Sequence, residues 1–398
     1  MLDAYASFRF RDYRFLIAAG FLSSFGLQML SVAVSWDLYT TTRSAVALGN
    51  VGLVQVTPFL LFALFAGHFA DRHDRRQIML VTQVMLLVSC VILALNPGSV
   101  SIIYICLFLI ATARTFQGPA RMAVLPHTVP ADTLRNAITW NSSTNEVASV
   151  GGPALAGILL ASAGSRTVYI VQCCCATLTL LCFYLLRFRS DTAREVLRPT
   201  GKSVLEGVRF LWTDKLILST MSLDLFSVFF GGATTLLPIY AVEILHTGAR
   251  GLGWLRAAPS IGAVVMALTQ AHFLRVHYAG RALLWSVAGF GAATVAFGLS
   301  RSLLLSFVTL VIVGALDNIS VVLRNSLVQT ATPDRLRGRV LAVNNIFISC
   351  SNQLGAVESG WTAAWFGPIP SVVAGGMITM MIVGAFAAKF PRLREWRQ

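Results

Sequence analysis

Charged residues are scarce in this chain of 398 residues. Only 12% of its residues are Asp, Glu, Lys or Arg, against about 25% in ordinary soluble domains. Hydrophobic residues make up 56%, and the mean hydropathy is +0.71. This composition excludes a soluble globular enzyme, a disordered protein and a small disulfide-linked domain. Its apolar surface needs the lipid bilayer as solvent, so we expect an all-α integral membrane protein.

Lysine is almost absent, and acidic residues are few. The 31 basic residues include three lysines and outnumber the 17 acidic residues, for a net charge of +14. In a soluble protein this excess would suggest nucleic acid as the partner. With both termini placed in the cytoplasm, however, 25 basic residues fall on the cytoplasmic side and five outside. This split follows the positive-inside rule and explains the charge without nucleic acid.

The sequence also lacks the common signatures of secretion, metal binding and catalysis. The apolar stretch after Arg14 is about 24 residues long and has no Ala-x-Ala pattern after it, so we expect an uncleaved first helix. The seven cysteines lie in apolar runs, and no metal-ligand spacing occurs among Cys and His. There is no Gly-x-Ser-x-Gly, His-Glu-x-x-His or phosphate-binding glycine loop. We expect no enzyme activity, no metal, no cofactor and no drive by ATP.

Long apolar runs, in contrast, recur along the whole chain. A membrane-spanning helix needs about 20 apolar residues, and twelve candidate spans meet this requirement. They are 15–38, 46–70, 77–95, 100–120, 137–161, 167–187, 216–240, 251–273, 282–299, 302–323, 340–364 and 370–389. Twelve spans place both termini on one side of the membrane, which we predict to be the cytoplasm. The expected location is a bacterial-type inner membrane.

The chain divides near its midpoint into two similar halves. The longest polar stretch, 188–214, predicts a cytoplasmic linker between a six-helix bundle at 1–187 and another at 215–398. An amphipathic surface helix is predicted around Ser203–Trp212. A shift of 203 residues superimposes six identical positions of the two halves. These pairs are Arg121 with Arg324, Pro130 with Pro333, Asn141 with Asn344, Gly152 with Gly355, Gly157 with Gly360, and Gly164 with Gly367. The repeat predicts two pseudo-symmetric bundles.

A glycine and charge cluster closes the second span. The stretch 67–76 reads Gly-His-Phe-Ala-Asp-Arg-His-Asp-Arg-Arg. It resembles the signature loop of the major facilitator superfamily, in which a conformational latch is expected at Gly67, Asp71, Arg72, Arg75 and Arg76. Gly67 would allow close helix approach, Asp71 would lie at a helix N-terminus, and the arginines would pair with it or with lipid headgroups. The alternative is a solvated basic turn.

A second motif lies in the fifth span. Residues 151–157 read Gly-Gly-Pro-Ala-Leu-Ala-Gly, and proline together with small residues favours a bend and tight packing. The stretch resembles the Gly-Pro-x-x-Gly-Gly motif of facilitator antiporters, with Gly152, Pro153 and Gly157 matching and Ala156 departing from it. Ordinary small-residue packing is the alternative.

Two further stretches are more particular. Residues 117–130 and 332–340 are similar to the superfamily branch that contains enterobactin exporters and macrolide efflux pumps. The resemblance implies the twelve-helix facilitator fold and export of small organic molecules from the cytoplasm by proton antiport with alternating access. Two alternative functions stay open within this class, a dedicated siderophore exporter and a lipid or lysolipid translocator. An intramembrane enzyme is the alternative from another class. We expect a monomer whose partners are its substrate, protons and the bilayer.

Four ionisable residues are predicted at one depth in the membrane. Arg114 and Asp317 each precede an arginine by seven residues, about 10 Å along a helix. Glu146 and Asp224 lie at a similar depth in their spans. Such groups are costly and usually functional, so these four predict the substrate cavity and the proton-coupling site. A carboxylate without a basic partner is a natural proton carrier. Static ion pairs are the alternative, which the sequence leaves open for Arg114 with Glu146.

Overall fold

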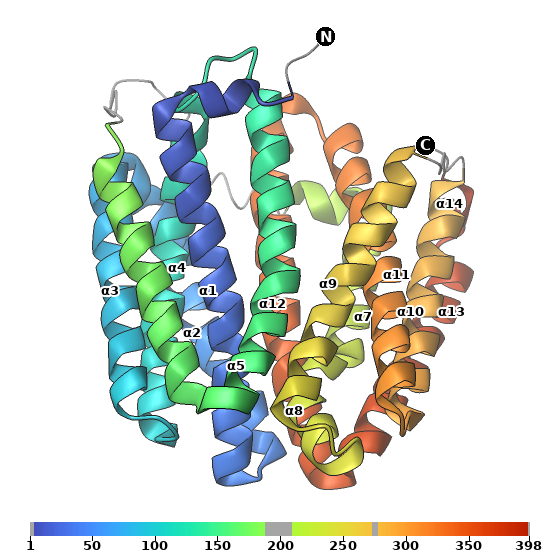
Figure 1. Ribbon diagram of the computed structural model, residues 1–398. Coiled ribbons are helices and arrows are strands. Elements are labelled where there is room, and N and C mark those ends of the chain that lie inside the picture. Colours follow the sequence, from blue (N-terminus) through green and yellow to red (C-terminus); the bar gives the residue numbers. More distant parts are fainter. Residues whose placement is uncertain (1–3, 188–208, 273–277, 397–398) are drawn as a thin grey trace. The chain divides into compact units, whose positions relative to one another are not determined.

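The computed structural model describes residues 4–187, 209–272 and 278–396 (Figure 1). The secondary structure of this part is helical, with no strand in it. Ten of its helical segments are long and apolar enough to cross a membrane, which confirms the prediction of an all-α membrane protein. Most of the predicted linker, and 203–208 of the predicted surface helix, lie outside the described residues.

The chain divides into two compact units. Unit 1 comprises Met1–Thr42 and Val54–Val196, and unit 2 comprises Arg43–Leu53 and Leu197–Gln398. The division therefore runs through one helix, α2, whose beginning groups with unit 2. There Gly49 lies against Gly360, where an added Cβ would come within 3.0 Å of the Gly360 Cα atom.

Five long helices build unit 1. They are α1 (Arg11–Thr42), α2 (Ala45–Arg72), α3 (Arg75–Leu95), α4 (Val100–Val124) and α5 (Leu134–Leu185) (Figure 1). The last of them has 52 residues and contains a sharp turn at Gly164, whose φ is 77°. Glycine has no Cβ and takes this left-handed conformation without strain. The turn separates two stretches that correspond to the fifth and sixth predicted spans, 137–161 and 167–187.

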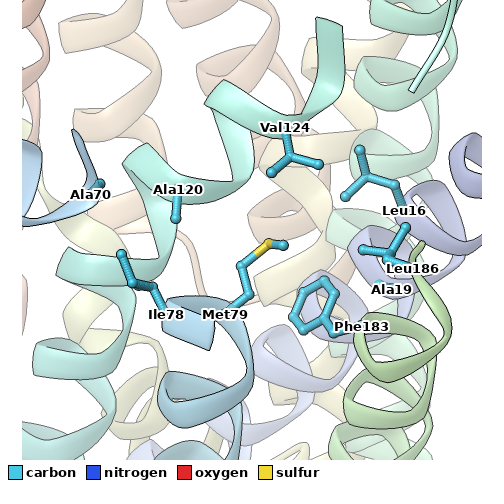
Figure 2. Close-up of a cluster of buried hydrophobic side chains, with 9 residues drawn as sticks. All are labelled: Leu16, Ala19, Ala70, Ile78, Met79, Ala120, Val124, Phe183 and Leu186. Atoms are coloured by element: carbon cyan, nitrogen blue, oxygen red, sulfur yellow. The ribbon is translucent and has the colours of Figure 1, made fainter. Parts of the chain in front are cut away.

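An apolar cluster holds one end of unit 1 together (Figure 2). Every one of the five helices supplies side chains to it or ends beside it. Its buried members are Leu16, Ala19, Ala70, Ile78, Met79, Ala120, Val124, Phe183 and Leu186. Met79 and Phe183 are among the largest fully buried side chains of the described residues. Lipid tails are as apolar as these residues, so close packing, rather than a hydrophobic effect, stabilises such a cluster in a bilayer.

Unit 2 contains a second set of helices. Its helices are α7 (Lys215–Gly231), α9 (Gly248–His272), α10 (Ala279–Leu299), α11 (Leu303–Ala331), α12 (Asp334–Phe366), α13 (Pro368–Lys389) and the short α14 (Pro391–Glu395). The α12 helix occupies the position of the eleventh predicted span but is not among the ten apolar segments. Six polar residues between Asn344 and Gln353 lower its hydropathy, namely Asn344, Asn345, Ser349, Ser351, Asn352 and Gln353.

A break interrupts the seventh predicted span. The α7 helix ends at Gly231, and irregular turns follow it. These turns are a 3-10 turn at Ala233–Leu236, a short α8 at Leu237–Ile239 and a π turn at Tyr240–Ile244. The predicted span at 216–240 falls within the candidate span Lys215–Ile244, but it is not one continuous helix. Gly231 faces the ring of Phe290, and two consecutive glycines together with Pro238 weaken the helix there.

Candidate functional site

A polar cavity of about 250 Å³ lies inside unit 1. Its polar lining comes from four helices, with Ser24, Gln28 and Ser31 on α1, Gln55 on α2, Arg114 on α4 and Asn145 on α5. The hydroxyl of Ser24 donates a hydrogen bond to Asn145 Oδ1 at 2.6 Å, and Gln28 Nε2 donates to Ser149 Oγ at 3.2 Å. These bonds connect α1 with α5 beside the cavity.

Small residues of α5 allow α1 to lie close to the cavity wall. A Cβ on Gly152 would stand 2.8 Å from the Phe25 carbonyl oxygen, so only glycine fits there. Pro153 and Gly157 are buried beside it, and the helix continues through the proline. The motif at 151–157 thus packs α5 against α1. Packing of this kind is the alternative that the sequence left open.

Arg114 is the one charged residue among the described residues that line this cavity. Its side chain is exposed to the cavity, ten residues from the last residue of α4. Among the described residues no ion pair or hydrogen bond of its guanidinium is found. Glu146, on α5, is exposed and makes no ion pair with Arg114 in this structure. The static Arg114–Glu146 pair that the sequence left open is therefore absent from the described residues.

In unit 2, Asp224 of α7 forms an ion pair with Arg324 of α11. Both side chains are buried, with 7% of Asp224 and 2% of Arg324 exposed. The sequence predicted that the tenth span ends at residue 323, just before Arg324, and this end is wrong. The α11 helix continues to Ala331, past the predicted end at residue 323, and carries Arg324 into the protein interior.

The matching arginine of unit 1 has a different environment. Arg121, 203 residues before Arg324, lies in the last turn of α4 and donates a hydrogen bond to Asn141 Oδ1 at 3.1 Å. Its guanidinium covers Gly20 of α1, where an added Cβ would collide with it. The internal repeat thus pairs one arginine with a carboxylate and the other with an amide.

Asp317 stands two helical turns before Arg324 on α11 and has no ion pair among the described residues. It lines a cavity of about 140 Å³, together with the broken segment Gly231–Thr234 after α7 and with Asn352 of α12. Asp317 and Asp224 also border one narrow gap, beside Ser227 and Ser320. Unit 2 therefore brings the two predicted carboxylates together, one of them paired and the other unpaired.

Two basic residues of the stretch 67–76, Arg75 and Arg76, cap neighbouring helices of unit 1. Arg75 donates a hydrogen bond to the carbonyl of Ala123 at 3.4 Å, near the end of α4. Arg76 donates to the carbonyls of Phe183, at 3.4 Å, and Tyr184, near the end of α5. Cations at helix C-termini complement the helix dipole. The expected partner Asp71 has its side chain outside the described part, and Asp74 caps α3 instead.

Gly67 does not bring helices together in this structure. No described atom lies within 4 Å of the position that its Cβ would occupy. The close approach predicted at Gly67 is therefore not made among the described residues. Arg72 is exposed, as a solvated basic turn would require. The structure thus gives Arg75 and Arg76 a role in packing, which the signature alone did not indicate.

Comparisons with known proteins agree with this architecture. Residues 2–398 match the family model described as transmembrane secretion effector. The enterobactin exporter of Citrobacter koseri is 27% identical over 97% of this chain and 93% of its own length. The staphyloferrin A transporter of Staphylococcus aureus is 25% identical over 83% of this chain and 84% of its own.

Solved structures show the same fold. A bacterial homolog to the human lysosomal transporter Spinster, inward-facing and unoccupied, matches with a TM-score of 0.79 at 16% identity, over 97% of this chain and 98% of that one. The POT family transporter PepTSo matches with a TM-score of 0.77 at 12% identity, over 96% of this chain and 98% of that one. These matches carry the fold alone. With the family model spanning nearly the whole sequence, the chain belongs to the transmembrane secretion effector family and is a multi-pass transporter of the major facilitator superfamily, not an enzyme.

Proposed function

We propose that this protein exports a small iron-chelating molecule, a siderophore in its iron-free form, from the cytoplasm. The observation that carries the proposal is the likeness to the enterobactin exporter and the staphyloferrin A transporter over most of the chain. The polar cavity of unit 1 supports it, because a siderophore is rich in oxygen groups that hydroxyls, amides and a guanidinium can bind. The same lining disfavours a lysolipid, whose long tail needs an apolar cavity.

In this proposal the chain crosses the membrane twelve times and forms two six-helix bundles. The substrate site opens alternately to the cytoplasm and to the outside. Ten helical segments of the described residues are candidate membrane spans. The turn at Gly164 divides one of them into two spans, and α12 supplies the twelfth. Both termini then face the cytoplasm, which agrees with the positive-inside distribution. The protein acts as a monomer in a cytoplasmic membrane.

Protons drive the export. Asp317 is the proposed proton carrier, because it lines a cavity and has no basic partner among the described residues. Asp224 is held by Arg324 and serves mainly to balance its charge. Glu146, exposed on α5, is the next carboxylate to consider. The loop with Gly67, Asp71, Arg72, Arg75 and Arg76 keeps the proposed role of a conformational latch, and the motif with Gly152, Pro153 and Gly157 that of an antiporter bend.

Complementation in cells tests the proposed cargo. A bacterium that makes enterobactin but lacks its own exporter is supplied with this chain, and enterobactin in the medium is measured. We expect secretion to return, and to fail with an empty vector. A parallel test of resistance to macrolides separates the drug-export alternative. Resistance without secretion of enterobactin or of any other siderophore tested would reject the proposed cargo.

A further inference from the structure

Arg114 places an uncompensated positive charge at membrane depth. Its guanidinium faces the cavity of unit 1 and has no ion pair or hydrogen bond among the described residues. A charge in such a position is costly unless a counter-charge or water stabilises it. The arginine of α4 nearest to it along the helix, Arg121, has a side-chain partner in Asn141. Arg114 is therefore poised for a partner that the described residues do not supply.

The residues around Arg114 favour an anion as this partner. The described lining residues include no carboxylate, and their other polar side chains are hydroxyls and amides. The Ser24 hydroxyl already donates to Asn145, whereas the amides of Gln28, Gln55 and Asn145 still offer N–H donors. The remaining lining is apolar and includes Leu107 and Ile110. A guanidinium has a planar fork of donors that matches two adjacent oxygen atoms, as in a carboxylate or a catecholate.

The size of the cavity limits what enters it. Its volume of about 250 Å³ is below the range of about 300–1,000 Å³ that is usual for whole drug-sized ligands. It has room for a single hydroxy-acid or dihydroxyphenyl arm and not for a whole chelator with several arms. One arm with a pair of oxygen atoms therefore fits the chemistry and the volume together.

We propose that the Arg114 cavity binds one chelating arm of the cargo through its pair of adjacent oxygen atoms, and so selects the iron-free form. This inference rests on the proposed siderophore export. The oxygen atoms that Arg114 would bind are those that coordinate iron, so an iron-loaded arm cannot present them to the guanidinium. The exporter then releases empty chelator and does not carry iron out of the cell.

Binding of a single arm to the purified full-length protein tests this inference. The probe is 2,3-dihydroxybenzoate, titrated by calorimetry, with its dimethyl ether (2,3-dimethoxybenzoate) and its gallium complex as comparisons. Gallium(III) occupies the oxygen atoms as iron does but is not reduced. We expect the free acid to bind, and we expect both the dimethyl ether, whose two adjacent oxygen atoms are methylated, and the gallium complex to bind at least about tenfold more weakly.

Substitution of Arg114 tests whether this residue binds the probe. Arg114→Lys keeps the charge but loses the fork, so we expect affinity for the free acid to fall about tenfold or more. Arg135→Gln, at an exposed arginine of the same unit, is the control and should bind as the unmodified protein does. Melting curves verify that each variant is folded. Equal affinity of Arg114→Lys, equal binding of the gallium complex, or no binding of the free acid would overturn the inference.

The experiment in cells and the binding experiment test the two proposals independently. Arg114-dependent binding of the probe without secretion of any siderophore would reject the proposed cargo and leave an oxygen-anion site. If secretion is restored but the affinity for the probe does not depend on Arg114, this inference is rejected and the proposed export stands.

Discussion

Asp224 on α7 and Arg324 on α11 form an ion pair inside unit 2, and both side chains are buried. At the matching position of unit 1, Arg121 covers Gly20 and bonds to Asn141 instead. The two halves of the repeat therefore share an arginine and differ in its partner. Beside one narrow gap, unit 2 has a paired carboxylate, Asp224, and a carboxylate without an ion pair among the described residues, Asp317. Asp317 rather than Asp224 is therefore the proposed proton carrier.

The Asp224–Arg324 pair predicts a strong asymmetry between single and double substitutions. Asp224→Asn leaves Arg324 buried without its counter-charge, which we expect to cost about 3 kcal/mol or more of stability. Asp224→Asn combined with Arg324→Gln removes both charges and should recover most of the loss. Melting temperatures in detergent measure this, with Asp132→Asn at an exposed site as the control. A double variant as unstable as the single one would contradict the pair's role.

The glycines of the two motifs are expected to tolerate alanine very differently. Gly152→Ala places a methyl group 2.8 Å from the Phe25 carbonyl oxygen, so we expect a loss of about 1–3 kcal/mol from overpacking. Gly67→Ala meets no described atom within 4 Å, and alanine favours a helix by up to about 1 kcal/mol. Thermal unfolding of the two variants compares them. If Gly152→Ala were the more stable variant, α1 and α5 would not pack as described.

Arg76 is expected to matter for stability more than its neighbour Arg72. Arg76→Gln loses the hydrogen bonds to the carbonyls at the end of α5 and the contact of its guanidinium with the ring of Tyr184, at 5.7 Å. We expect a loss of about 1–2 kcal/mol. Arg72→Gln, at an exposed side chain, should change stability by less than about 0.5 kcal/mol. Equal melting temperatures for the two variants would show that the capping contacts contribute little.

The composition and the length of the apolar runs were enough to predict the membrane class and most of the helices. The family followed from short motifs at 67–76, 117–130, 151–157 and 332–340. Hydropathy alone misplaced Arg324, because it ended the tenth span where charge appears, whereas a buried partner, Asp224, lets the helix continue past that point. The repeat with Arg121 contained a signal, since a position kept in both halves is seldom a chance loop residue.

The break after α7 and the absence of an Arg114–Glu146 pair were not predictable from the sequence. The break depends on how Gly231 meets Phe290 from α10, a contact between distant segments. Residues 114 and 146 were placed at one depth from their distances to helix ends, but depth does not say which way a side chain points. The sequence therefore identified the candidate residues, and the structure decided which of them pair.

Proton-coupled export through Asp317 is the central claim, and flux into proteoliposomes tests it most directly. Enterobactin accumulation is measured under an imposed pH gradient for the unmodified protein, for Asp317→Asn and for the control Asp132→Asn. A neutral side chain cannot carry the proton, so we expect Asp317→Asn to lose accumulation against the enterobactin gradient while it retains downhill exchange, and the control to accumulate normally. Accumulation by Asp317→Asn equal to that of the unmodified protein would contradict the account.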